Sequence, residues 1–403
     1  MTRQLRGSLW AGIAILLTLG ISTRGEGGIT YRNPIIEGNL ADPAVILHEG
    51  TYYLYATGEV DGDNGYRVYT STNLVDWKKG PVVFQPGERH IWAPDVWRDP
   101  VSGRVFLYYT ANQTIGVAEG DGPLGPFTIR RKLFDRAIDA HLFHDDDGRL
   151  FLYFVQLPGF RIMVQPMASP TEPSGEPKMI LRPQSDWETR VGHVTEGPWI
   201  IKHQDRYYML YSGSGADTPD YAVGYAVADH PMGPFTRASH NPIVHRAEGV
   251  FGPGHGCAVR DIAGRWWHIY HQKRNDRVEW DRFICMDPLR FDEEGNLFGT
   301  ATRGTPQPVP AGGDWLAEGF TRPPEQTKPW CYWYWISDNL SKEGITRDLE
   351  AMARVGIGEA FIGNIFLDDV PAGQIKVLTE EWWALVEHAI REGGRLGDRK
   401  SVV

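Results

Sequence analysis

Five polar residues stand at the start of five strand-like segments, and their types could support acid–base chemistry. They are Asp42, Asp95, Asp139, Glu196 and His255. Each is followed by a short apolar stretch, a turn, and a doublet of large residues that begins 10 or 11 positions after it. Carboxylates and a histidine at the same place in a repeat predict a shared functional site. Bringing like charges together lowers the stability of a protein, so a purely structural protein would have no reason to do so.

Two carboxyl groups on opposite sides of a sugar can cleave a glycosidic bond. One protonates the leaving oxygen and the other acts on the opposite face of the sugar. In the inverting mode a water molecule lies between base and sugar, and the carboxyl groups stand about 6.5–9.5 Å apart. A third carboxylate raises the pKa of the acid by like-charge repulsion. A set that includes Asp42, Asp139 and Glu196 therefore predicts an inverting glycoside hydrolase.

The segments around these residues are predicted to form β-hairpins. Turn pairs such as Glu49-Gly50 and Asp147-Gly148 separate two strand-like runs in each copy. The copies recur about every 50 residues, and residues 30–310 show no sustained helical period. Repeats of this length with three or four strands are typical of propeller blades. We predict an all-β, five-bladed β-propeller whose five lead residues occupy equivalent positions and converge on the central channel.

The motifs around the lead residues resemble those of glycoside hydrolase family 43 in order and spacing. The resemblance covers about residues 30–310 and rests on Asn33-Pro34, Ala41-Asp42-Pro43, Trp92-Ala93-Pro94-Asp95, Ile138-Asp139-Ala140, Thr195-Glu196-Gly197-Pro198 and Gly252-Pro253-Gly254-His255-Gly256. The sequence departs from the family pattern at Ala140, where proline is usual, and at Cys257, where serine is usual. Neither departure removes a carboxyl group, so the expectation of activity stands.

The resemblance implies a role for each of the three carboxyl groups. Asp42 would be the general base that activates water, and Glu196 the general acid. Asp139 would raise the pKa of Glu196 and hold its orientation. Trp92 would line the sugar subsite, and Arg282 would contact the terminal sugar.

His255 resembles the central-channel histidine of the family, which is often associated with a bound cation or a water cluster. Substrate binding, a Ca²⁺ ion in the central channel held through water, and a structural hydrogen bond are all open roles for His255. The predicted chemistry requires no cofactor. For Asp95, a buried hydrogen-bonding role between blades is favoured over a catalytic one.

The N-terminal residues have the pattern of a signal peptide, predicted over residues 1–25. Arg3 and Arg6 precede an apolar run from Leu9 to Ile21, which is short for a membrane span. We expect export to the periplasm or the extracellular space, with no membrane span after processing. No Ala-x-Ala cleavage site is present, so an uncleaved anchor is the alternative.

The composition narrows the choice of partner. The chain has 51 acidic and 41 basic side chains without a basic cluster, which argues against a nucleic-acid partner. Its 15 Trp, 17 Tyr and 16 Phe suit both a β-rich core and platforms for sugar rings. Cys257, Cys285 and Cys331 are too few for a disulfide framework. We expect a monomer with a carbohydrate partner.

The chain changes character after residue 310. A linker over residues 311–328 is followed by a strand from Trp330, a helix capped by Ser341, a second strand, and a helix opened by Thr379. This order is typical of a βα-repeat domain, and it resembles the start of the catalytic barrel of glycoside hydrolase family 106, a rhamnosidase family. Such a barrel needs about 250 residues. For residues 329–403 we therefore expect a truncated, inactive and poorly packed barrel-type fragment.

Three hypotheses follow for the propeller. The leading one is removal of terminal α-L-arabinofuranosyl or β-D-xylosyl units from plant-type polysaccharides. The alternatives are a galactan-directed hydrolase on the same fold and a non-catalytic, carbohydrate-binding propeller. Intact Asp42 and Glu196 argue against the binding module.

Overall fold

The computed structural model describes residues 29–58, 60, 64–311 and 328–396. It contains two compact units, one within Ile29–Pro323 and the other within Pro324–Val403. The signal peptide predicted over residues 1–25 and most of the linker predicted over residues 311–328 lie outside the described residues. Among the described helices, none combines the length and the apolar character needed to cross a membrane.

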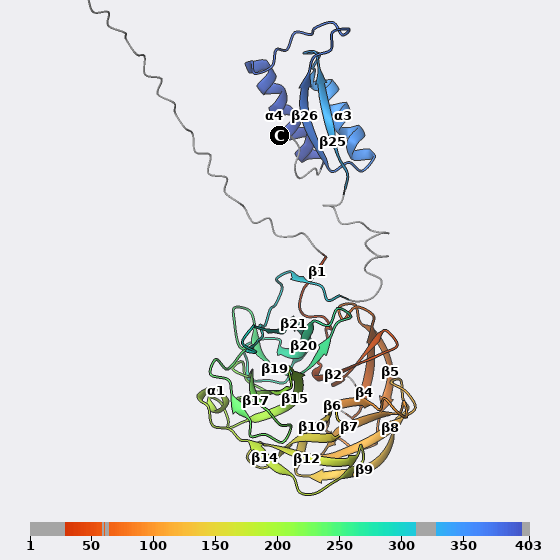
Figure 1. Ribbon diagram of the computed structural model, residues 1–403, viewed down its shortest axis with the longest axis vertical. Helices are drawn as coiled ribbons and strands as arrows, with labels where there is room; N and C mark the ends of the chain where they lie inside the picture. The colour runs from red at the N-terminus through yellow and green to blue at the C-terminus, as the bar shows by residue number, and fades with distance from the viewer. Residues whose placement is uncertain (1–28, 59, 61–63, 312–327, 397–403) are drawn as a thin grey trace, which may run out of the picture. The chain divides into compact units, whose positions relative to one another are not determined.

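The first unit is a five-bladed β-propeller, as the repeats predict (Figure 1). Blade one contains β2 (Ala41–His48), β3 (Thr51–Thr57), β4 (Tyr66–Ser71) and β5 (Lys78–Phe84). Blade two contains β6 (Ile91–Arg98), β7 (Val105–Ala111), β8 (Thr114–Gly120) and β9 (Thr128–Asp135). Blade three contains β10 (Ala137–His144), β11 (Leu150–Gln156), β12 (Arg161–Ser169), β13 (Glu172–Pro173) and β14 (Lys178–Leu181).

The remaining blades follow the same antiparallel order. Blade four contains β15 (Thr195–His203), β16 (Arg206–Gly213), β17 (Ala222–Ala228) and β18 (Thr236–Arg237), with the single-turn helix α1 (Asp186–Thr189) before it. Blade five contains β19 (Phe251–Arg260), β20 (Trp266–Lys273) and β21 (Arg282–Pro288). A small hairpin of β22 (Arg290–Phe291) and β23 (Leu297–Phe298) follows. The first strands of the blades, β2, β6, β10, β15 and β19, contact one another in sequence and form the inner ring.

The second strands of the blades form the core between blades. Tyr52 and Leu54 of β3 pack with Trp267 and Ile269 of β20, which joins blade one to blade five. Because successive side chains of a strand point to opposite faces, alternate residues of one strand serve two neighbouring cores. Tyr55, next to Leu54, lies in the core between blades one and two. The doublets of large residues that identify the repeats in the sequence therefore mainly pack between neighbouring blades.

The ring closes through the N-terminal segment of the unit. Strand β1 (Thr30–Tyr31) pairs with β24 (Gln307–Pro308). The buried Asn33 accepts a hydrogen bond from the backbone N–H of Met286 and donates one to its carbonyl, both at 2.8 Å. Cys257 and Cys285 are buried and form no disulfide bond with each other.

The second unit is a βαβα arrangement with two parallel strands, as the sequence predicts. It consists of β25 (Trp330–Ile336), α3 (Lys342–Arg354), β26 (Glu359–Ile365) and α4 (Glu380–Arg395). Ser341 and Thr379 cap the two helices by accepting hydrogen bonds from the backbone N–H groups of Gly344 and Trp382.

The packing of this second unit differs between the two faces of its sheet. Trp333 and Trp335 lie in a core with both helices, so the expectation of poor packing is wrong for this face. Trp330, Tyr332 and Tyr334 on the other face are each more than half exposed. The difference follows from strand alternation, because both helices cover the same face of a two-stranded sheet.

Candidate active site

Each inner strand contains a β-bulge that turns one residue into the left-handed backbone region. The register of the first two strands shifts at this point in all five blades. In β19 the register shifts twice, and the earlier shift lies at Gly252 (48°). The other bulge residues with positive φ are Asp42 (52°), Ala93 (44°), Asp139 (58°), Gly197 (58°) and His255 (36°). Left-handed backbone costs free energy in residues other than glycine. Because it recurs in all five blades, the bulge is a feature that the blades share.

A hydrogen bond from the preceding blade supports each of these five bulge residues. Their backbone N–H groups all donate to a side chain of the neighbouring blade. The donor–acceptor pairs are Ala93 to Thr57 Oγ1 (2.8 Å), Asp139 to Thr110 Oγ1 (3.3 Å), Gly197 to Asp139 Oδ2 (3.1 Å), His255 to Ser212 Oγ (2.8 Å) and Asp42 to His271 Nδ1 (3.3 Å). The ring of bulges is thus tied together at all five blade interfaces.

The prediction that the five lead residues occupy equivalent positions is wrong for two of them. Asp42, Asp139 and His255 are bulge residues, whereas Glu196 lies one residue before the bulge at Gly197. Asp95 follows the bulge, and its Oδ2 accepts a hydrogen bond from the backbone N–H of Leu142 at 2.7 Å. Asp95 therefore links blades two and three, as the sequence favoured. The alignment fails because Glu196 stands one residue before the bulge residue of its strand and Asp95 stands two residues after its own.

The carboxylate of Asp42 is surrounded by an arginine and two histidines. Its Oδ2 accepts a hydrogen bond from Thr57 Oγ1 at 2.7 Å, and its Oδ1 lies 3.3 Å from Nδ1 of His255 and 3.6 Å from a guanidinium nitrogen of Arg282. Burial raises the pKa of Asp42, but the charges of His255 and Arg282 and the contact with His271 bring it well below its usual range. Burial lowers the pKa of both histidines.

Glu196 has the opposite electrostatic setting. Burial, together with the charges of Asp42 and Asp217, raises the pKa of Glu196 to about 7. A hydrogen bond from the Tyr221 hydroxyl to Oε1, at 2.7 Å, and the charge of Arg282 oppose this rise. Glu196 therefore keeps its proton at a pH where an ordinary glutamic acid has lost it.

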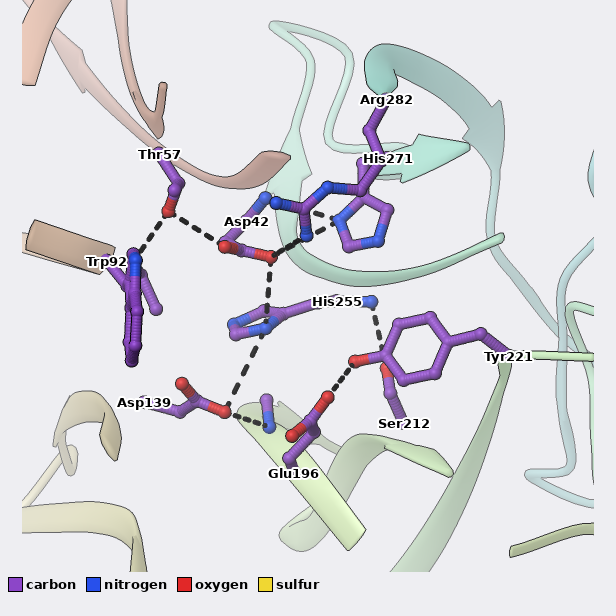
Figure 2. A network of polar contacts seen from close by, with 12 residues as sticks. Asp42, Thr57, Trp92, Asp139, Glu196, Ser212, Tyr221, His255, His271 and Arg282 are labelled. Carbon is purple, nitrogen blue, oxygen red and sulfur yellow. Dashed lines mark hydrogen bonds and ion pairs between the residues drawn. The ribbon is translucent and has the colours of Figure 1, made fainter. Parts of the chain in front are cut away.

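His255 lies between Asp42 and Asp139, and Asp139 lies beside Glu196 (Figure 2). Nδ1 of His255 is 3.9 Å from Oδ2 of Asp139 and 3.3 Å from Oδ1 of Asp42. Burial and the charges of Glu196 and Asp42 raise the pKa of Asp139 well above its usual range, against the hydrogen bond from Gly197. Asp42, whose pKa is lowered, thus lies in one buried cluster with Asp139 and Glu196, whose pKa values are raised, and this is the pattern that separates a base from an acid.

The two residues assigned to substrate contact also belong to this region. Trp92 is partly exposed and, in Figure 2, lies beside the carboxylates on the side away from Tyr221. Arg282 is buried, and its guanidinium carbon lies 5.2 Å from the ring centre of Trp280, which is 57% exposed. The guanidinium thus contacts both the carboxylate of Asp42 and an exposed aromatic ring.

The described residues contain no group of three or more His, Cys, Asp or Glu side chains arranged to hold a metal ion. The ring nitrogen of His255 that faces the channel already contacts two carboxylates. These contacts give no support to a calcium ion at His255, which stays a prediction.

The sequence motifs did not include several residues that contact the candidate carboxyl groups or the bulge residues. Thr57, Ser212 and His271 stand near the ends of the second strands, and Tyr221 precedes β17. A search for hydroxyl residues at the ends of the repeats could have found Thr57 and Ser212. No local pattern marks Tyr221, because its contact with Glu196 depends on how the loop before β17 folds back.

A five-bladed propeller whose inner strands bring together carboxyl groups with opposite pKa shifts fits the class of glycoside hydrolases. Residues 31–297 match the family described as Glycosyl hydrolases family 43, and the chain belongs to this family. The resemblance inferred from the blade motifs is confirmed.

Known proteins of the same kind align over most of the propeller. The chain is 29% identical to the Beta-D-galactofuranosidase xynD of Aspergillus niger, over 66% of this chain and 83% of that protein. It is 26% identical to an Extracellular exo-alpha-(1->5)-L-arabinofuranosidase of Streptomyces avermitilis, over 91% of this chain and 82% of that protein. A thermostable family-43 glycoside hydrolase of known structure is 34% identical, with a TM-score of 0.65, over 70% of this chain and all of that chain.

The second unit matches a different family. Residues 321–403 match the family described as alpha-L-rhamnosidase, in agreement with the resemblance to family 106. The two matches occur in the order that the sequence predicts.

Proposed function

We propose that Asp42 is the general base, Glu196 the general acid and Asp139 the group that sets the proton affinity of the acid. The observation that carries these roles is the opposite shift of two pKa values in one pocket. The pKa of Asp42 lies below its usual range, and that of Glu196 rises to about 7. The same buried pocket therefore offers a carboxylate that can accept a proton and a carboxyl group that can donate one.

The reaction follows from these protonation states. Asp42 takes a proton from water as the water oxygen attacks the anomeric carbon. Glu196 gives its proton to the glycosidic oxygen as the bond between that oxygen and the anomeric carbon breaks. The new bond forms on the face opposite the leaving group, so the anomeric configuration inverts.

Asp139 supports the acid by charge and by position. Two neighbouring carboxyl groups cannot both ionise without mutual repulsion, so Asp139 and Glu196 favour a protonated state between them. The hydrogen bond from the N–H of Gly197 to Asp139 also ties Asp139 to the residue next to Glu196. Asp139 thereby acts on both the pKa of Glu196 and the backbone that carries it.

The proposed substrates are terminal α-L-arabinofuranosyl or β-D-xylosyl units of plant-type polysaccharides. The similarity to an exo-acting arabinofuranosidase supports this choice. A β-D-galactofuranoside is the second candidate, and the similarity to a galactofuranosidase favours it over other galactan linkages. Trp92, Arg282 and His255 are the proposed contacts to the sugar.

We also propose that the protein is exported to the periplasm or the extracellular space and acts as a monomer. The charged and apolar pattern of residues 1–25 supports export. A relative described as extracellular supports it as well.

The test compares the wild-type chain with Glu196→Gln on arabino-, xylo- and galactofurano-oligosaccharides. These have poor leaving groups, so loss of the acid is expected to reduce turnover about 10²- to 10⁴-fold. Glu172→Gln, at the outer edge of blade three, is the matched control and should keep full activity. NMR of the first product formed should show inversion of the anomeric centre. Unchanged turnover by Glu196→Gln would refute the assigned acid.

A further inference from the structure

Tyr221 is a buried tyrosine beside the proposed acid and lies outside every motif of the repeat. It directly precedes β17, is fully buried, and donates a hydrogen bond to Oε1 of Glu196 at 2.7 Å. Figure 2 shows the phenol reaching Glu196 from the side opposite Trp92. Burial and the charge of Glu196 raise the pKa of Tyr221 well above its usual value, so the hydroxyl stays protonated and donates.

The ring of Tyr221 is fixed by stacking on His271. The two ring centres are 5.6 Å apart and the planes differ by 8°. Nδ1 of His271 accepts the backbone N–H of Asp42 at 3.3 Å. Burial lowers the pKa of His271 to about 4, so its imidazole is neutral and able to accept near pH 7. One pair of stacked rings therefore contacts both the proposed acid and the proposed base.

The inner strand of blade five is shaped to admit this ring. A Cβ atom on Gly254 would lie 2.2 Å from Cδ1 of Tyr221, closer than real side chains approach. Two residues earlier, the backbone N–H of Gly252 donates to the carbonyl of Pro219 at 2.9 Å and holds the loop that leads to Tyr221. The position of Tyr221 is thus determined by small residues of β19 as well as by its own loop.

Resting on the roles proposed for Asp42 and Glu196, we propose that Tyr221 is a positioning residue for catalysis. Its hydroxyl holds Oε1 of Glu196, so that Oε2 is the oxygen that carries the proton to the leaving group. Its ring, stacked on His271, ties this orientation to the backbone of the base. The hydrogen bond also stabilises the ionised product form of the acid.

The first test is the pH dependence of kcat/KM for Tyr221→Phe. The charged and titratable groups that act on Glu196 besides Tyr221 are Asp42, Asp139, Asp217 and Arg282. All of them are kept in this variant. Loss of the hydroxyl removes a bond to the ionised form, so the alkaline limb should move up by about one pH unit. Lost orientation of Glu196 should lower kcat about tenfold.

Tyr211→Phe is a matched control in the same blade. Tyr211 is fully buried and also donates a 2.7 Å hydrogen bond to a buried glutamate, Glu188, but at a distance from the pocket. The two variants should lose comparable thermal stability, whereas only Tyr221→Phe should move the alkaline limb. A limb that stays in place in folded Tyr221→Phe, or moves equally in Tyr211→Phe, would overturn the proposal.

A second probe avoids the risk of misfolding. Incorporation of 3-fluorotyrosine at position 221 keeps the ring and strengthens the hydroxyl as a donor, so the alkaline limb should move to lower pH. An unmoved limb would again overturn the role of Tyr221. Failure of the proposed acid is distinguishable, because active Glu196→Gln would refute that assignment whatever Tyr221→Phe does.

Discussion

Two buried glutamates of blade four have the same hydrogen bond but opposite protonation. Glu188, in helix α1, and Glu196, in β15, each accept a 2.7 Å hydrogen bond from a buried tyrosine. Glu188 also accepts hydrogen bonds from Arg237 and from the backbone N–H groups of Gln184 and Ser185. Burial raises the pKa of Glu188, but these donors bring it below its usual value, whereas the pKa of Glu196 rises to about 7.

The difference shows what separates a structural carboxylate from a reactive one in this fold. Burial disfavours the charged form in both places. Around Glu188 a guanidinium and several N–H groups compensate for that cost, and the carboxylate holds α1 against β16 and β18. Around Glu196 other carboxylates replace these donors. The proton therefore stays on Glu196, where it can be transferred.

The largest expected effect is the loss of activity in Asp42→Asn. The amide cannot take a proton from water, so turnover should fall about 10³-fold. The fold should persist, because asparagine has nearly the same size and keeps an oxygen that can accept the hydrogen bond from Thr57. Steady-state kinetics and circular dichroism measure the two effects. Asp76→Asn, an exposed aspartate near the outer edge of blade one, is the control, and equal losses in both variants would contradict the site.

A smaller effect on folding is expected for Arg237→Met. This change leaves the fully buried Glu188 without its guanidinium partner and should lower the free energy of unfolding by about 3 kcal/mol. Because the pKa of Glu188 is lowered in the folded protein, its stabilisation is present above pH 4.5 and is lost at lower pH. The deficit should shrink as the pH falls. Denaturant unfolding at pH 7 and pH 4 measures this, and activity per folded molecule should not change.

The smallest effect is the pH dependence of the unmodified enzyme. Glu196 must be protonated to act, and its pKa is about 7. The value of kcat/KM should therefore fall above about pH 7, approaching tenfold for each further pH unit. Activity that stays constant up to pH 9 would mean that Glu196 does not supply the proton.

Local sequence was sufficient for the repeated hairpins and for the caps of the second unit. Strand alternation and turn residues act over a few positions, so the five hairpins could be predicted without tertiary information. Ser341 and Thr379 cap α3 and α4 for the same reason, since a cap involves only the next three residues.

Contacts between distant residues could not be predicted in this way. Glu196 reaches the pocket from the position before its bulge, and the bulge was not visible in the spacing of the repeats. The contact between Tyr221 and Glu196 depends on a loop and on the space left by Gly254. Strand alternation divides the side chains of β25 between two faces, but it does not say which of the two faces the helices cover.

The sequence by itself determined that carboxyl groups recur near the start of four of the five hairpins, with His255 in the fifth, because residue type and repeat length are properties of the chain alone. The tertiary structure decided which of them act as charges and which hold protons. His255 and Arg282 of blade five lower the pKa of Asp42, whereas the charge of Asp42 itself helps to raise the pKa of Glu196. Because electrostatic energies depend on distance and burial, these proton affinities arise only when the ring of blades is closed.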